Sequence, residues 1–415
     1  MPGTPAPDAP LPPLPAKHQE ALDKILIHLC VKPAPARDGP PQRKRAKVLE
    51  ARSPPERLRN AARFFVRGVH LDQNLSCVLD DGAEARWKGT DASDLTPEQA
   101  TTVAAHTKSF DALICHVPDL EPVLQYIYAH YSNAWELLVK ELHKVARQTR
   151  CNDSNEFKHE THYFVPNPGL DVLDPPLGTG ESKEDRGFKH GFLRLLCMPW
   201  RDRITQPPWS FKSIAAVPDT RSDEQKARGD RIMQRIDAKL YKPNPKLFPS
   251  FLYEDGSYDK ENPLNGLFRG YLVIRNIRHT WTSPTTATTG LGHNGLPRRC
   301  HARTHRSFRM TPPKVGYAVS QAYVMLMPYD WDNCPGLSAL YDSVLKVFLG
   351  EHVDDEWAEE TLAYLQSQVY GQTATQEPAH DPSLDSDEDE DECDHMEKIQ
   401  MLARARRSER EAAAR

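Results

Sequence analysis

The sequence lacks the features that mark several classes of protein. None of its apolar runs approaches the roughly 18 residues that a membrane helix needs, and residues 1–17 lack the charged-then-apolar order of a secretory signal. No two of the eight cysteines form a C-x-x-C pair, which argues against a zinc ribbon or a disulfide framework. Serine hydrolase and kinase signatures are absent. We therefore expect an intracellular protein with reduced thiols and no membrane partner.

The sequence also lacks a strong overall charge. The formal net charge is −5 over 415 residues, so the whole molecule carries no nucleic-acid signature and the local distribution of charge matters more. Glycine is ordinary at 21 residues, but the 36 prolines are nearly twice the usual share. This composition predicts folded segments that are separated by stiff polar ones.

Shifts in composition along the chain predict four regions. Residues 1–56 form a Pro-rich, basic, disordered arm with a short amphipathic helix at 17–30, where Leu22, Ile25, Leu26 and Leu29 share one face. Residues 57–371 form a single, mainly α-helical domain. Residues 372–394 form an acidic disordered linker, because like charges at that density repel one another. Residues 395–415 form a basic, Ala-rich terminal helix or tail.

Capping signals place several helices inside the 57–371 domain. Thr96 with Gln99, and Ser222 with Gln225, predict capping boxes, and Thr311 precedes a proline at the first helical position. Apolar spacing predicts further helices over 120–150 and 264–281. The stretch from Asn152 to Thr220 is rich in Pro and Gly, and we expect it to be an irregular, loop-rich insert. On this basis its H-E-x-H pattern at His159 is a coincidence, since zinc proteases need H-E-x-x-H on a helix.

Four stretches of the sequence together resemble a known family. They are "RGFKHGFLRLLCMPW" (186–200), "PSFLYEDGSYDKENPLNGLFRGYLVIRNIRHTWTSPTTA" (249–287), "MTPPKVGYAVSQAYVMLM" (310–327) and "WAEETLAYLQSQVYG" (357–371). The likeness spans roughly 55–371 and is to an uncharacterised domain family of mushroom-forming (basidiomycete) fungi, often found near mobile-element genes. The resemblance implies a fungal, mainly helical protein. It supplies no catalytic or binding residues.

The segment "TTGLGHNGLPRRCHARTHR" (288–306) combines a glycine pattern with a Cys–His cluster. Gly290, Gly292 and Gly295 match G-x-G-x-x-G, but "SPTTATT" before them is no core strand, so we interpret them as a turn between helices. A metal would have His293, Cys300, His301 and His305 as ligands, and the flanking arginines would repel it. We therefore predict no metal and no cofactor, and keep His293, Cys300 and His305 only as weak candidates.

Basic residues provide the remaining functional signal. The run Arg43, Lys44, Arg45 and Lys47 lies in a Pro-rich arm and predicts a nuclear-import signal read by an import receptor. Ser386, which acidic residues follow, is a candidate phosphorylation site. If the 288–306 loop folds back on the preceding helix, one surface could bind the phosphate backbone of nucleic acid without reading its sequence. That surface would comprise Arg275, Arg278, Arg298, Arg299, Arg303, Arg306, Arg309 and Lys314.

These features favour a nuclear, non-enzymatic binding or interaction protein over the alternatives. Its candidate partners are nucleic acid or a nuclear protein. One alternative is a metal-dependent enzyme, such as a nuclease, whose carboxylates converge only in the fold. The other is a self-associating helical scaffold module, and the sequence leaves the oligomeric state open.

Overall fold

The computed structural model describes most of the helical part of the chain. It describes residues 14–30, 53–89, 95–166, 183–203, 222–238 and 240–241, residues 247–371 without 257, 291–296, 298–299 and 306, and short pieces at 173, 176–177, 209–210 and 213–216. Of the predicted N-terminal arm, residues 1–13 and 31–52 with the import signal lie outside these residues, and so does all of 372–415 with Ser386. The contacts of the chain divide it into two compact units, Met1–Arg150 and Cys151–Arg415, and the division falls inside α7.

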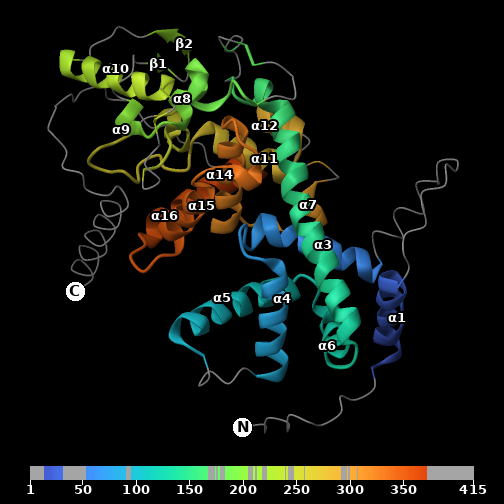
Figure 1. Cartoon of the computed structure of the whole chain (residues 1–415). Coiled ribbons are helices and arrows are strands. Elements are labelled where there is room, and N and C mark those ends of the chain that lie inside the picture. Colours follow the sequence, from blue (N-terminus) through green and yellow to red (C-terminus); the bar gives the residue numbers. More distant parts are fainter. Residues whose placement is uncertain are drawn as a thin grey trace, which may run out of the picture. The chain divides into compact units, whose positions relative to one another are not determined.

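The described part of the first unit consists of helices (Figure 1). Its elements are α1 (Ala16–Cys30), α3 (Pro54–Gly68), α4 (Leu75–Ala83), the π-helix η1 (Glu84–Lys88), α5 (Pro97–Ile114), the 3₁₀ turn η3 (Pro118–Leu120), α6 (Glu121–His130) and the first half of α7 (Ser132–Phe164). The expected helix at 17–30 and the capping box of Thr96 and Gln99 are both present.

The second unit is also helical, with one small strand pair. Its elements are the rest of α7, η4 (Gly187–Lys189), α8 (Gly191–Cys197), α9 (Trp200–Arg203), the antiparallel pair β1 (Trp209–Ser210) and β2 (Ser213–Ala216), α10 (Asp223–Asp237), η5 (Ser250–Leu252), η6 (Glu254–Gly256), α11 (Tyr271–Trp281), α12 (Pro284–Thr289), α13 (His301–Thr304), α14 (Pro312–Leu326), η7 (Trp331–Asn333), α15 (Leu337–Leu349) and α16 (Asp355–Tyr370). The expected capping box of Ser222 and Gln225 begins α10.

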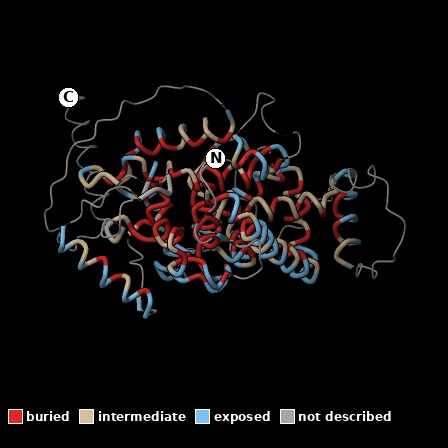
Figure 2. Tube along the Cα trace, turned by 90° about the horizontal axis from the view of Figure 1, so that it is seen from above, coloured by how far each residue is buried: buried red, intermediate tan, exposed pale blue. Residues whose placement is uncertain are grey.

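The predicted mainly α-helical fold is confirmed. Most helices carry buried residues on one side and exposed residues on the other (Figure 2), which is the expected pattern for helices around a core. The exception is α14, which is buried at every position from Lys314 to Leu326 and packs against α11 and α15. None of the helices described is long and apolar enough to cross a bilayer. The single domain over 57–371 stays a prediction.

The helix expected over 120–150 is two helices that meet at Tyr131. The backbone of Tyr131 leaves the helical region, with φ −133° and ψ 64°. Its amide still donates to Ile127 O at 2.8 Å, and its carbonyl accepts from the Trp135 amide at 2.9 Å. The hydrogen-bond ladder therefore continues on both sides of the bend, which explains why the apolar spacing alone gave no sign of it.

The largest correction concerns the segment after Asn152. The prediction of an irregular insert from that residue is wrong at its start, because α7 continues to Phe164 and carries His159 and Glu160 on a helix. The buried face of this stretch includes the polar side chains of Asp153, Ser154 and Thr161. A polar stripe does not produce the apolar period on which sequence interpretation depends.

The helix expected over 264–281 begins only at Tyr271. A turn precedes it, in which Phe268 has φ 63° and the Arg269 amide donates to Gly266 O at 3.1 Å. Leu267 and Phe268 are fully buried, so the apolar pattern predicted burial correctly and helix wrongly. A short helix, α12, then follows Ser283, which forms a capping box with Thr286.

We expect Gly270→Ala to destabilise this turn. A Cβ at Gly270 would lie 2.0 Å from the Phe251 carbonyl oxygen, and the Gly270 amide donates to Leu252 O at 3.1 Å. Because both neighbours are backbone atoms, the chain must shift, and the free energy of unfolding should fall by about 1–3 kcal/mol. Gly191→Ala is the matched control, since nothing lies within 4 Å of its Cβ position. Urea unfolding of both variants measures this, and equal stability of the two would contradict the steric argument.

Candidate functional site

Buried cations at the ends of helices are the main polar feature of the second unit. Their shared property is that they donate to backbone carbonyl oxygens, and for all of them except Lys314 these include carbonyls in or just beyond the last turn of a helix; the carbonyls of Lys314 lie in the segment before α14. The side chains are Lys183, Arg186, Arg275 and Lys314, which are 7%, 3%, 5% and 1% exposed, and the partly buried Arg278. The last carbonyls of a helix have no partner within the helix and carry a partial negative charge, so cations stabilise them.

The end of α14 receives two of these cations. Lys183 Nζ donates to Val324 O at 3.2 Å and to Tyr329 O at 2.8 Å, which lies just beyond the helix. Arg186 Nη1 donates to Met325 O at 3.0 Å. Asp330 Oδ1 lies 3.7 Å from Lys183 Nζ, but its side chain is exposed.

The end of α7 is held in the same way from two directions. Arg186 Nη2 donates to Lys158 O at 2.8 Å, and its Nη1 donates to Thr161 Oγ1 at 2.7 Å. Arg275, from α11, donates to Pro166 O at 2.6 Å and to Phe164 O. Arg186 therefore joins α7 to α14, and Arg275 joins α7 to α11.

Arg278 and Lys314 serve two further segments. Arg278 donates from Nε and Nη2 to Gln368 O, at 2.9 and 2.7 Å, near the end of α16. Lys314 Nζ donates to Ser307 O at 2.9 Å and to Arg309 O at 2.7 Å. The same ammonium lies 4.1 Å from the centroid of the Trp281 ring, which is a favourable cation–π distance.

Burial lowers the pKa of each of these five groups. It lowers the pKa of Lys314 to about 7, and it lowers the pKa of Lys183 to about 8 although Asp330 opposes the shift. It also lowers the pKa of Arg186 to about 10, and the pKa values of Arg275 and Arg278 fall for the same reason. Low polarity disfavours the charged form, so the carbonyl oxygens around each group are what make its burial tolerable.

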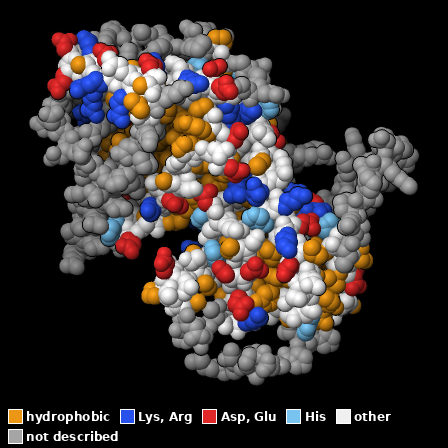
Figure 3. Space-filling view, viewed as in Figure 1, with side chains coloured by type: hydrophobic (Ala, Val, Ile, Leu, Met, Phe, Trp, Pro, Cys, Tyr) orange, Lys and Arg blue, Asp and Glu red, His pale blue; other side chains and the backbone are white. Residues whose placement is uncertain are grey.

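These contacts involve three members of the predicted phosphate-binding surface. Backbone carbonyls of the same unit accept donors of Arg275, Arg278 and Lys314, so these donors are directed into the unit. Arg303 and Arg309 are exposed, and Arg303 Nε donates to Pro297 O at 3.0 Å. Arg298, Arg299 and Arg306 lie outside the described residues. On the face shown in Figure 3, Lys and Arg side chains are interspersed with Asp and Glu.

The structure places the Cys–His cluster only in part. Cys300 and His305 are buried, His301 Nδ1 lies 2.6 Å from Thr280 O, and the rings of His301 and His305 are 5.9 Å apart. His293 lies outside the described residues. Within the part of the chain that is described, no group of three or more His, Cys, Asp or Glu side chains is placed to hold a metal ion.

A second candidate site lies in the first unit, where α1 packs against α3 and α6; we call the surface of these two helices that α1 covers the groove. This 15-residue helix contacts α3 and α6 (Figure 1), and it buries Ala21, Leu22 and Ile25 there. Leu22 and Ile25 are each 1% exposed. The apolar face that the sequence predicted for residues 17–30 is therefore the face that docks.

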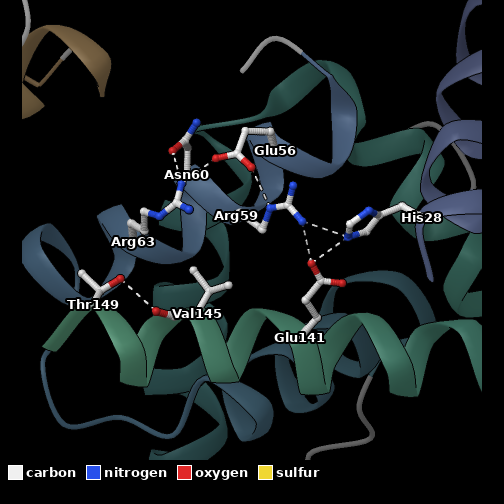
Figure 4. Close-up of polar contacts among 8 residues, drawn as sticks. All are labelled: His28, Glu56, Arg59, Asn60, Arg63, Glu141, Val145 and Thr149. Carbon is white, nitrogen blue, oxygen red and sulfur yellow. Dashed lines mark hydrogen bonds and ion pairs between the residues drawn. The ribbon is translucent and has the colours of Figure 1, made fainter. Parts of the chain in front are cut away.

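A polar clasp fixes the C-terminal end of α1 (Figure 4). We use this name for His28, Arg59 and Glu141, which come from α1, α3 and α7. Glu141 Oε1 lies 2.9 Å from His28 Nε2 and 3.0 Å from Arg59 Nη1, and these two nitrogens are 2.9 Å apart. His28 Nε2 thus either donates to the carboxylate or accepts from the guanidinium, and both arrangements tie α1 to the groove.

A further carboxylate holds Arg59 in position. Glu56 accepts from Arg59 Nε and from Arg63 Nη1, both at 2.7 Å, and Arg63 also donates to Asn60 Oδ1 at 2.6 Å. Burial acts to raise the pKa of Glu56, but the hydrogen bonds from Arg63 and Arg59 outweigh it and the pKa is lowered. The sequence offers no signal for this network, since its members lie as far apart as 28 and 141.

A family profile described as "Family of unknown function (DUF6698)" matches residues 144–370. This match covers more than half of the 415 residues. The chain belongs to this family. The expectation of an uncharacterised domain family is thus confirmed in that form. The DUF6698 region contains all five buried cations, whereas α1 and the clasp precede it.

The comparisons add no further relative. No protein with curated annotation and no solved structure matches the chain.

Proposed function

We propose that the chain is a non-catalytic interaction protein whose first unit binds an amphipathic helix in the groove that α1 occupies. One observation carries this proposal: the amphipathic helix α1 packs against both α3 and α6 and is held there by the clasp. Amphipathic helices that lie in apolar grooves are a recurrent mode of protein recognition, with anchor side chains one turn apart. Leu22 and Ile25 have that spacing.

The free energy with which α1 docks on α3 and α6 is small enough for another helix to displace it. Fully burying a leucine or an isoleucine contributes about 1.5–3 kcal/mol, and ion pairs with exposed members add up to about 1 kcal/mol. The clasp members His28 and Glu141 are 35% and 27% exposed, so their share is small. A helix of 15 residues is also marginal by itself in water. A competing helix therefore has only a few kcal/mol to overcome.

The remaining features extend this proposal. The run Arg43 to Lys47 supports a nuclear location, and the family resemblance supports a fungal origin and a link with mobile elements. In this proposal the buried cations of the DUF6698 region maintain its fold, and the exposed arginines Arg303 and Arg309 are the described residues through which nucleic acid would be contacted.

We expect a labelled peptide of residues 16–30 to bind the full chain once its own α1 has been unseated. The double variant Leu22→Asp/Ile25→Asp places two carboxylates in the groove contact, which unseats α1 and leaves the groove open. Fluorescence anisotropy should show at least about tenfold tighter binding of the peptide to this variant than to the natural chain, whose own α1 competes at high effective concentration.

Glu20→Gln/Lys24→Gln is the matched control, because both side chains are exposed on the outer face of α1. This variant should bind the peptide as weakly as the natural chain does. A peptide that carries the two Asp substitutions should bind neither. Absence of binding to the unseated variant would remove the proposed function.

A further inference from the structure

The chemistry of the groove also points to its partner. We infer that the groove exchanges α1 between two copies of this chain, so that the helix of one copy docks on α3 and α6 of the other. This inference rests on the proposed function of the groove. It goes further by naming a second copy as the partner.

The length of chain after α1 permits the exchange. Residues 31–52 join Cys30 to Ser53, and these 22 residues can span up to about 70 Å. Docking within one copy needs far less, because His28 near the end of α1 already lies 2.9 Å from Arg59 in the second turn of α3. The connection is therefore long enough to reach the groove of a neighbouring copy as well as its own.

The exchange conserves every contact. Each copy supplies one helix and one groove, so two exchanged helices bury the same Leu22 and Ile25 side chains and re-form the same two clasps. The cost of opening is the small energy of the α1 contact, and it is recovered when both grooves are filled again. Exchange of an identical element is a low-cost route to a closed, two-fold dimer for this reason.

Exposed apolar side chains on both sides of the clasp favour a second copy there. Ile27, next to His28 on α1, is 62% exposed, and Leu137, one turn before Glu141 on α7, is 46% exposed. Residues four apart on a helix share a face, so Leu137 lies on the side of α7 that carries the clasp carboxylate. Large apolar side chains in this position are typical of a surface that an association covers.

Isotope-mixed cross-linking of the natural full-length chain tests the exchange. Lys24 lies one turn before His28 on α1, and Lys140 is next to Glu141 on α7. Their side chains are 52% and 71% exposed, so both amines can react. Equal amounts of ¹⁴N and ¹⁵N chain are incubated together, treated with an amine-reactive cross-linker and digested. Complete exchange should place about half of the Lys24–Lys140 links between a light and a heavy peptide.

The result separates this inference from the proposed function. Mixed links should increase with protein concentration and disappear in Leu22→Asp/Ile25→Asp. The control variant Glu20→Gln/Lys24→Arg keeps the α1 contact but has no cross-linkable amine at position 24. It should therefore lose the Lys24 link and still sediment as a dimer. Links that are all-light or all-heavy at every concentration would overturn the exchange. If the 16–30 peptide nevertheless binds the unseated variant, the groove function stands and only the second-copy partner is wrong.

Discussion

Replacing Arg186 with methionine is expected to lower the free energy of unfolding by about 3–5 kcal/mol. The guanidinium is 3% exposed and joins the ends of α7 and α14 through Lys158 O, Thr161 Oγ1 and Met325 O. Methionine preserves much of the packing but offers no donor. The carbonyls of Lys158 and Met325 would then lose their charged partner, at a cost of about 1–3 kcal/mol each. Relief from burying the charge offsets only part of this cost.

Arg231→Met is the matched control for Arg186→Met. Arg231 is exposed on α10, so its replacement should change stability by less than about 0.5 kcal/mol. Urea unfolding followed by circular dichroism measures both variants. If they lost similar stability, the helix-end contacts of Arg186 would not be the source of the effect.

The second large effect is expected for Lys314→Met, and it should depend on pH. Near pH 7 the loss should be about 2–3 kcal/mol, because Ser307 O and Arg309 O lose their donor and Trp281 loses its cation. Burial lowers the pKa of Lys314 from 10.5 to about 7 in the folded chain. Between these two values the unfolded chain binds a proton that the folded chain lacks, so the natural chain gains stability as the pH rises.

Lys314→Met cannot gain this stability, because methionine does not titrate. The difference between the natural chain and the variant should therefore grow by about 1 kcal/mol per pH unit above pH 7. Unfolding experiments at a series of pH values measure this difference. Lys346→Met, at an exposed position on α15, is the matched control that removes a lysine outside the core. A constant difference for Lys314→Met would mean that the lysine keeps its ordinary pKa.

These effects bear on how nucleic-acid binding should be tested. Substitution of Arg275 or Arg278 would remove contacts to helix ends, and substitution of Lys314 would remove contacts to the segment before α14, so the resulting loss of binding would reflect loss of folding. Among the described members of the predicted surface, Arg303 and Arg309 are the exposed positions, so they are the suitable ones for that experiment.

The sequence predicted well wherever local chemistry decides structure. Thr96 and Ser222 begin helices with complete capping boxes, since a cap involves residues only three positions apart. At Thr311 the helix begins as expected, but no cap hydrogen bond forms from its side chain. The expectation of an uncharacterised domain family is confirmed as well, because a family profile depends on the order of residues along the chain.

The same local rules failed where distant partners decide. Asp153 and Ser154 are buried polar residues on α7, and their partners are Tyr317 Oη at 2.6 Å and Gln321 Oε1 at 3.0 Å, both from α14. The sequence around these residues does not show that hydrogen-bond partners from α14 lie opposite them, so the sequence pattern from Asn152 predicts an irregular segment. At Phe268 the error is the reverse: the apolar pattern predicts a helix, but the residue is buried in a turn.

The sequence by itself determined the helical class of this protein, several helix starts and the apolar face with which α1 docks. Each of these depends on residues a few positions apart, where hydrogen bonds and the 3.6-residue period act locally. Only the tertiary structure decided what the charged residues do. In the folded chain Arg275 and Lys314 donate to buried backbone carbonyls. His28, Arg59 and Glu141 contact one another although they come from three different helices. The partner of a charged side chain depends on which helices pack together, and the sequence does not give that packing.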